Sequence, residues 1–193
     1  RQEGYEGASA VKFCADTHLH KTDFGLVRLN VSATDLPSSK AEISQRAKKA
    51  GATCGSVLVE EMIADGLLEW FVGFKRDRTF GPVVIVGAGG IFAESMAAPQ
   101  IRLAPIDLST ALQLIKSHPA YPAIAGARKR PPADVDEFAR AICRASQFFA
   151  NNADFISEMD LNPIIVRPAS VAMRGESSVV VADAAFKLVG AKA

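Results

Sequence analysis

The sequence has few cysteines and no long hydrophobic run, and each shortage excludes a class of protein. Its three cysteines are scattered, without Cys-x-x-Cys spacing, which argues against a disulfide framework or a zinc cluster and fits a reducing compartment. No apolar run approaches the ~20 residues of a membrane span, and the first four residues are too polar for a signal peptide. We therefore expect a cytoplasmic protein with no membrane partner.

An excess of charge of one sign is also missing. The chain carries 22 Lys and Arg residues against 21 Asp and Glu residues, a net charge of +1. A dedicated nucleic-acid-binding protein would show a strong basic footprint, so we expect no nucleic-acid partner, although a local site for an anionic ligand is compatible with this balance. The 193 residues, 49% hydrophobic and 22% charged, suffice for one ordinary domain or two small subdomains with a real core.

The order of expected elements is mixed rather than strictly alternating, which favours α+β subdomains over a doubly wound sheet. The patterns predict strands over 9–15, 26–31, 56–62, 68–75, 82–86, 156–162 and 178–183, and helices over 39–50, 109–116 and 134–150. Ser39 and Glu42 form a capping-box pattern at the start of the first helix, and Gly51 follows its end. Pro163 is expected to end the strand before it.

The strand expected over 156–162 carries the strongest chemical signal. Because side chains alternate along a strand, Glu158, Asp160 and Asn162 share one face, while Met159 and Leu161 pack on the other. Three oxygen-bearing side chains therefore lie along one strand. A solvated strand face is the commoner explanation for such a pattern taken alone.

The last expected strand is apolar until it ends in Asp183. If the two strands pair so that Asp183 lies beside Asn162, they supply the sparse oxygen set that magnesium takes while it keeps waters and substrate phosphates. The sequence thus offers two interpretations of this region, a magnesium site and a solvated face.

Three further features are compatible with a phosphate site, and each has a structural alternative. Lys12 is the only charge in its strand, and it could reach an edge or bind phosphate. The glycine cluster at 87–90 could cradle a phosphate or simply connect strands tightly. His20 lies in a polar loop, where a solvated role competes with phosphoryl or proton transfer. For His118, beside a proline at a helix end, we expect a structural role.

Eight short motifs in sequence order resemble the ATP-grasp region of NDP-forming acyl-CoA synthetases, a family related to the succinyl-CoA synthetase β-subunit and to ADP-forming acetyl-CoA synthetase. The motifs lie at 10–12, 20–23, 57–62, 75–82, 87–92, 102–105, 130–135 and 158–163. The resemblance extends from about residue 7 to residue 189. It implies an ATP-grasp fold of two α+β subdomains: residues 1–57 as a partial subdomain A, truncated at its N-terminus, and residues 58–193 as subdomain B with the magnesium-binding strands.

The resemblance also implies roles for residues of the first subdomain and the connection after it. Lys12 matches the lysine that contacts the nucleotide phosphates. Glu60, Glu61 and Met62 match the hinge between the subdomains, where a strand edge reads adenine chiefly through backbone groups. ATP or ADP is accordingly the expected nucleotide.

In the second subdomain the resemblance favours the magnesium interpretation. Asn162 and Asp183 match the pair that holds Mg²⁺ beneath the phosphates. Gly89 and Gly90 are the candidate phosphate-binding glycines.

Two residues are the candidates for phosphoryl transfer itself. Asp160 matches an acidic position that faces the phosphorylated histidine visiting this site. His20 matches a histidine near the phosphates that relays a phosphoryl group. The loop after His20 departs from the family pattern, because Leu26 stands where a second glycine is usual.

The family reaction converts acid, CoA and ATP into acyl-CoA, ADP and phosphate through an acyl phosphate and a phosphohistidine. The resemblance assigns nucleotide binding and phosphoryl transfer to this chain and CoA binding to CoA-binding and CoA-ligase domains that lie elsewhere. The sequence begins at Arg1 and within a few residues enters a strand, so we expect a piece of a longer enzyme, inactive when isolated. Association into an oligomer is compatible with all of this.

Two other functions are compatible with the same motifs. Related ATP-grasp regions are fused to protein acetyltransferases, where they serve as regulatory modules. A magnesium-dependent carboxylate–amine ligase shares ATP-grasp chemistry but needs no phosphohistidine. The retained Lys12, His20, Asp160, Asn162 and Asp183 favour the acyl-CoA synthetase.

Overall fold

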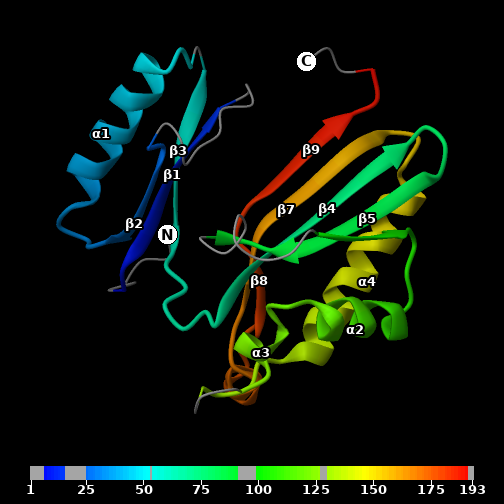
Figure 1. Cartoon of the computed structure of the whole chain (residues 1–193). Coiled ribbons are helices and arrows are strands. Elements are labelled where there is room, and N and C mark those ends of the chain that lie inside the picture. Colours follow the sequence, from blue (N-terminus) through cyan, green and yellow to red (C-terminus); the bar gives the residue numbers. More distant parts are fainter. Residues whose placement is uncertain (1–6, 16–24, 53, 91–98, 127–129, 191–193) are drawn as a thin grey trace. The chain divides into compact units, whose positions relative to one another are not determined.

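The computed structural model describes residues 7–15, 25–52, 54–90, 99–126 and 130–190. The chain divides into two compact units, Arg1–Ala64 and Asp65–Ala193 (Figure 1). The boundary expected after residue 57 falls inside a strand of the first unit, Gly55–Glu61. No helix of the described residues is both long and apolar enough to cross a membrane.

The first unit is a three-stranded antiparallel sheet with one helix. The strands β1 (Ser9–Ala15), β2 (Val27–Val31) and β3 (Gly55–Glu61) are ordered β2-β1-β3, and helix α1 spans Leu36–Lys49. Alternation along the strands directs the apolar set toward α1, where it forms the core of the unit: Val11, Phe13, Leu26, Val31, Ile43 and Ala47.

Helix α1 begins about one turn earlier than the capping-box pattern predicts. Its N-cap is Asp35, and Pro37 occupies the first turn, where its fixed φ suits a helix and its missing N–H costs no hydrogen bond. Ser39 lies inside the helix and is buried, so the predicted cap at Ser39 is wrong. The helix ends as expected just before Gly51, which has φ +87°.

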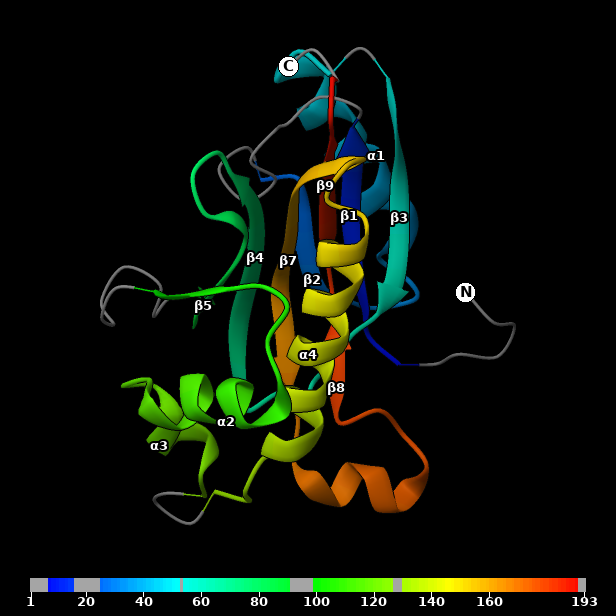
Figure 2. The same ribbon diagram turned by 90° about the vertical axis from the view of Figure 1, so that its right-hand side faces the viewer.

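The second unit is a six-stranded antiparallel sheet covered on one face by helices. The order is β6 (Gln100–Leu103), β5 (Gly81–Ala88), β4 (Leu68–Asp77), β7 (Ile156–Val166) and β8 (Val179–Val181), and β9 (Ala184–Leu188) also pairs with β7. Helices α2 (Leu108–Ser117), α3 (Tyr121–Ile124) and α4 (Val135–Asn151) complete the unit, and Figure 2 shows α4 running in front of β7. The covered face holds the core, which includes Trp70, Val72, Phe74, Leu114, Phe138, Ile142, Phe149, Met159 and Leu161.

Strand β7 continues through Pro163, contrary to the predicted end at that residue. Trp70 of β4 pairs with Ile164 and Val72 pairs with Leu161, so two residues of β7, Asn162 and Pro163, lie opposite one residue of β4. A β-bulge tolerates proline because no ladder N–H is required there. The strand therefore reaches Val166, and a short 3₁₀ helix, η3 (Ala169–Arg174), follows it.

Candidate functional site

Asp183 lies beside Asn162 at a break between two strands. β8 pairs with residues 164–166 of β7, and β9 pairs with residues 156–161, so the single strand predicted over 178–183 is instead interrupted after Val181. At the break the Asn162 N–H donates to the Asp183 carbonyl oxygen at 3.0 Å, and the Ala182 N–H donates to the Pro163 carbonyl oxygen at 2.9 Å. The backbone thus fixes Asp183 next to Asn162.

Asp160 adds a carboxylate near this pair. It lies on the solvent-accessible face of β7, opposite the face occupied by the buried Met159 and Leu161. Desolvation by surrounding protein atoms, together with the negative charge of Asp183, raises the pKa of Asp160. The described part of the chain supplies no ion-pair partner to Asp160, so these two acidic groups repel each other.

Glu158 lies on the same strand face but in different electrostatic surroundings. Its carboxylate is 3.9 Å from the Lys75 ammonium nitrogen and 3.8 Å from that of Lys187. Nearby lysines therefore compensate the charge of Glu158. Asp160, farther along the same face, has the charge of Asp183 nearby instead.

The oxygen groups at the strand break suit a magnesium ion that is shared with a ligand. Mg²⁺ takes one or two carboxylates and fills its remaining positions with water and phosphate oxygens, and Asn162 and Asp183 provide one amide and one carboxylate. Among the described residues no group of three or more His, Cys, Asp or Glu side chains is placed to hold a metal. The donor set therefore fits a cation bound together with a nucleotide better than a closed structural metal site.

Lys12 is paired with Glu60 in the first unit. The lysine side chain is on the face of the sheet opposite the α1 core, and Lys12 is only 7% exposed. Its Nζ lies 2.5 Å from Glu60 Oε2. This short contact with a carboxylate orients the ammonium group on that face of the sheet.

The end of β3 presents backbone polar groups at an edge of its sheet. The Met62 N–H donates to the Ala8 carbonyl oxygen at 3.1 Å, and Glu61 pairs with Ser9. Hydrogen-bonded and non-hydrogen-bonded pairs alternate along an antiparallel ladder, so the Glu61 N–H and C=O point away from β1. Since β3 is an edge strand, these groups can contact the edge of a planar base.

Gly89 and Gly90 have a packing role after β5. The Gly89 N–H donates to the Glu69 carbonyl oxygen at 2.8 Å. A Cβ atom at Gly89 would lie 3.3 Å from the Trp70 carbonyl carbon, and Gly90 has φ +60°, which L-residues rarely adopt. The tight-connection interpretation therefore accounts for both glycines, and their phosphate role stays a prediction.

His20 lies outside the described residues. The described residues resume at Gly25, which has φ +61°, and Leu26 follows. Leu26 is fully buried in the core of the first unit, and its carbonyl oxygen accepts from the Phe13 N–H at 2.9 Å. The departure from the family pattern at Leu26 thus has a packing reason.

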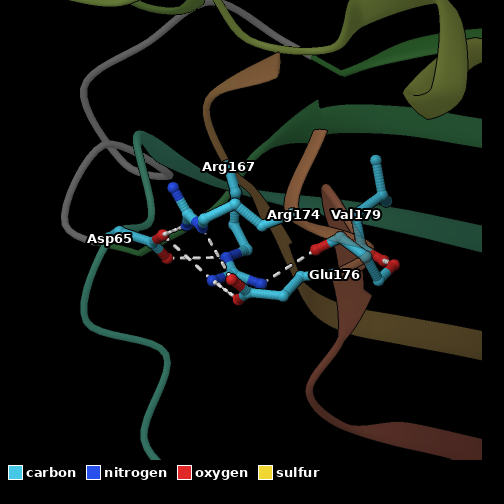
Figure 3. A network of polar contacts seen from close by, with 6 residues as sticks. Asp65, Arg167, Arg174, Glu176 and Val179 are labelled. Atoms are coloured by element: carbon cyan, nitrogen blue, oxygen red, sulfur yellow. Dashed lines mark hydrogen bonds and ion pairs between the residues drawn. The ribbon is translucent and has the colours of Figure 1, made fainter. Parts of the chain in front are cut away.

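Sequence reasoning missed a polar cluster at the other end of β7. Arg167 contacts Asp65 and Glu176, and Arg174 contacts Glu176 (Figure 3). Asp65 and Arg167 are 102 positions apart, and neither belongs to a local motif. Their pairing depends on the register of β4 and β7, which a single sequence does not display.

The fold and these residues define the class of protein. An antiparallel sheet with helices on one face, in one chain with a smaller α+β unit, is the ATP-grasp architecture that the motif order implies. A family model described as an ATP-grasp domain matches residues 2–188. The chain therefore belongs to the ATP-grasp family, and the predicted fold is confirmed.

Curated relatives identify the branch of the family. The chain is 35% identical over 184 residues to subunit beta of acetate–CoA ligase [ADP-forming] II from Pyrococcus furiosus, an alignment that covers 94% of this chain and 75% of that subunit. It is 36% identical over 157 residues to acetate–CoA ligase [ADP-forming] I from Archaeoglobus fulgidus, covering 80% of this chain but only 23% of that ligase. These names confirm the resemblance to acyl-CoA synthetases and favour a ligase over an acetyltransferase module.

Solved structures of one related enzyme resemble the fold of this chain. The dinucleotide-forming acetyl-coenzyme A synthetase 1 of Ca. Korarchaeum cryptofilum, in complex with coenzyme A, Ca-AMPCP and HgCl⁺, matches with a TM-score of 0.81 and 31% identity over 94% of this chain and 76% of that one. A second structure of that enzyme contains coenzyme A and Mg-AMPPCP, with its phosphohistidine segment pointing towards the nucleotide-binding site, and matches with a TM-score of 0.74 at 30% identity over the same shares.

Proposed function

We propose that this chain binds ATP and transfers phosphoryl groups in an ADP-forming acyl-CoA synthetase, which converts acid, CoA and ATP into acyl-CoA, ADP and phosphate. The observation that carries the proposal is the placement of Asp183 beside Asn162, with Asp160 on the same strand face. The Korarchaeum enzyme, whose fold this chain shares, is recorded with Mg-AMPPCP. The donor set at the strand break is the kind that such a metal–nucleotide complex uses.

In this proposal Asn162 and Asp183 bind Mg²⁺ through their side-chain oxygens. When bound, the cation neutralises the phosphate charge that develops during transfer. Desolvation and the negative charge of Asp183 raise the pKa of Asp160, and a cation at Asp183 would offset the second of these effects.

The first unit supplies the remaining nucleotide contacts in this proposal. Lys12 neutralises phosphate oxygens, and its pairing with Glu60 orients the ammonium group. The outward N–H and C=O of Glu61, next to Met62, bind the edge of the base. Recognition through peptide groups explains why the Glu61 side chain can remain exposed.

Asp160 and His20 serve phosphoryl transfer in this proposal. A histidine from a CoA-ligase domain approaches the nucleotide, and Asp160 accepts a hydrogen bond from the imidazole N–H that does not receive the phosphoryl group, which orients the ring. The segment described for the Korarchaeum enzyme supports such a visiting histidine. His20 relays a phosphoryl group from the same region, a role that rests on the sequence motif alone.

We further propose that CoA-binding and CoA-ligase domains act with this chain in the cytoplasm, either fused to it or as a second subunit. The Archaeoglobus ligase is much longer than this chain, and the Pyrococcus relative is named as a beta subunit. In either arrangement the proposed acyl-CoA chemistry belongs to the partner domains.

The test is titration of Mg-ATP into the intact protein with its CoA domains, with ADP and acyl-CoA measured across a panel of short acids. The expected result is stoichiometric formation of ADP and one acyl-CoA that depends on Mg²⁺, CoA and an acid. Nucleotide binding without ADP release would favour a regulatory module. Amide formation without a phosphohistidine would favour a carboxylate–amine ligase.

The His20 relay needs a separate experiment. The intact protein is exposed briefly to labelled ATP, in wild-type form and as His20→Ala, with the visiting histidine of the ligase domain mutated in both. Label that disappears with His20→Ala supports the relay. Equal labelling of both proteins removes His20 from it.

A further inference from the structure

The Arg167 side chain joins two separate segments of the second unit (Figure 3). Its Nε donates to Asp65 Oδ1 at 2.6 Å and its Nη2 donates to Asp65 Oδ2 at 2.9 Å, a bidentate pair. Nη1 donates to the Ser177 carbonyl oxygen at 2.9 Å, and Nη2 also donates to Glu176 Oε2 at 2.8 Å. Arg167 is only 9% exposed, so these acceptors satisfy a guanidinium that is largely removed from water.

One of the joined segments begins the unit. Asp65 is the first residue of the second unit and follows Met62 by three positions. Just after it, the Leu67 N–H donates to the Val166 carbonyl oxygen at 2.8 Å. A Cβ atom at Gly66 would lie 2.7 Å from Ile165 Cγ2, so glycine permits this close approach. Residues 65–67 are therefore fixed along the end of β7.

The other joined segment leads to Asp183. The Arg167 N–H donates to the Ser178 carbonyl oxygen at 2.8 Å, and Ser178 immediately precedes β8. The Ser178 hydroxyl donates to Asp134 Oδ2 at 2.9 Å, which ties the segment to the N-cap of α4. Arg167 thus fixes the start of the short strand that ends two residues before Asp183.

We propose that Arg167 and Asp65 are a positioning pair for nucleotide binding, an inference that rests on the proposed function. One guanidinium fixes both the segment that follows Glu61, the proposed base contact, and the strand that leads to Asp183, the proposed metal ligand. Neither Asp65 nor Arg167 contacts the nucleotide. The pair acts by ordering two segments before ATP arrives, so that nucleotide binding does not bear the entropy cost of ordering them.

If the pair had only a structural role, its removal would lower the stability of the protein but would leave the substrate affinities unchanged. The experiment therefore compares wild type, Asp65→Asn, Arg167→Lys and the double variant in the intact protein. Arg144→Gln is the matched control, because Arg144 also forms a short ion pair in this unit, with Glu137 on α4. KM values for Mg-ATP, acid and CoA are measured together with kcat, and hydrogen exchange is followed in the peptide that spans residues 62–68.

We expect each single variant to raise the KM for Mg-ATP about tenfold and to leave the KM values for acid and CoA within about twofold of wild type. The double variant should be no worse than Arg167→Lys alone, because that variant already removes the pair with Asp65. Exchange in 62–68 should be faster in all three variants and unchanged in Arg144→Gln. Asp65→Asn keeps the shape of its side chain and decides the question if Arg167→Lys does not fold.

Two contrary results have different meanings. An unchanged KM for Mg-ATP in folded Asp65→Asn, in a protein whose wild type binds Mg-ATP, overturns the positioning pair and leaves the proposed function intact. An equal increase in the KM values of all three substrates also overturns it, because the effect would then be a general loss of structure. Wild-type protein that does not bind Mg-ATP overturns the proposed function and this inference with it.

Discussion

The backbone N–H of Asn162 lies 3.0 Å from the carbonyl oxygen of Asp183, across a break between two strands that share one neighbour. Because the contact is made by backbone atoms, replacing either side chain leaves it in place. The two side chains can therefore be changed to test their chemistry with little effect on the fold.

We predict that Asp183→Ala or Asn162→Ala in the intact protein lowers acid-dependent ADP formation by about 10²-fold or more, because each variant removes one oxygen ligand of the magnesium ion. Steady-state assays over a range of Mg²⁺ concentrations measure the effect. Glu158→Gln is the matched control on the same strand, since Lys75 and Lys187 lie near that carboxylate. Wild-type turnover in both alanine variants would rule out the metal assignment.

The raised pKa of Asp160 predicts a pH-dependent cost in stability. In the folded protein Asp160 holds its proton to a higher pH than in the unfolded chain, whose pKa is near 3.8. Stability is therefore lost as the pH rises from that value through the folded pKa, and the full cost applies above both. We expect Asp160→Asn to raise the thermal midpoint at pH 7, with a smaller gain at lower pH and in the presence of Mg-ATP. No gain at pH 7 would contradict this prediction.

Lys12 allows a test of phosphate binding that is separate from the metal. We predict that Lys12→Met weakens Mg-ATP binding about tenfold or more, because one charge-assisted hydrogen bond contributes about 1.5–3 kcal/mol. Loss of its partly exposed pair with Glu60 should cost only about 1 kcal/mol of stability. Calorimetric titration and thermal unfolding measure the two effects, and Lys40→Met on α1 is the control. Unchanged affinity in Lys12→Met would remove Lys12 from the site.

We predict that His118 makes the stability of the folded protein sensitive to acid. The residue is 2% exposed, and its ring packs edge-on against Trp70 with centroids 5.0 Å apart and accepts a hydrogen bond from the Ala120 N–H through Nδ1. Burial lowers the pKa of His118. Below about pH 6.5 the imidazole therefore binds a proton in the unfolded chain but not in the folded protein. Stability should then fall with decreasing pH, by up to about 1.4 kcal/mol per pH unit.

Urea unfolding between pH 7.5 and pH 5 measures this dependence. His118→Asn is the useful comparison, because an amide oxygen can replace the Nδ1 acceptor while the side chain no longer titrates. We expect the pH slope to diminish in that variant. An identical slope in both proteins would assign the acid sensitivity to other groups.

The elements that the sequence predicted well are those with strong burial patterns. The strand over 9–15 and the helix that begins after Asp134 both have one side directed into a core. Strands β6 and β9 were missed because both lie at or near sheet edges, where exposed residues such as Leu103 and Phe186 follow no alternation. The structural role expected for His118 agrees with its burial.

The candidate site also has one part that the sequence predicted and another that it did not. The face shared by Asp160 and Asn162 followed from strand alternation alone, but its partner Asp183 could be placed only conditionally. The interruption between β8 and β9 depends on backbone hydrogen bonds to β7. The pair of Asp65 and Arg167 had no sequence signal at all, because it forms only after distant strands have come into register.

The length of the short strand β8 determines on which face of the sheet the Asp183 carboxylate lies. Its three residues pair with β7 in one register, with Val181 opposite Ile164, and the chain then reaches Asp183 beside Asn162. Because successive side chains point to opposite faces, inserting or deleting one residue in β8 would turn the carboxylate to the other side of the sheet. Such a change would disable the proposed metal site while every one of its ligands remained in the sequence.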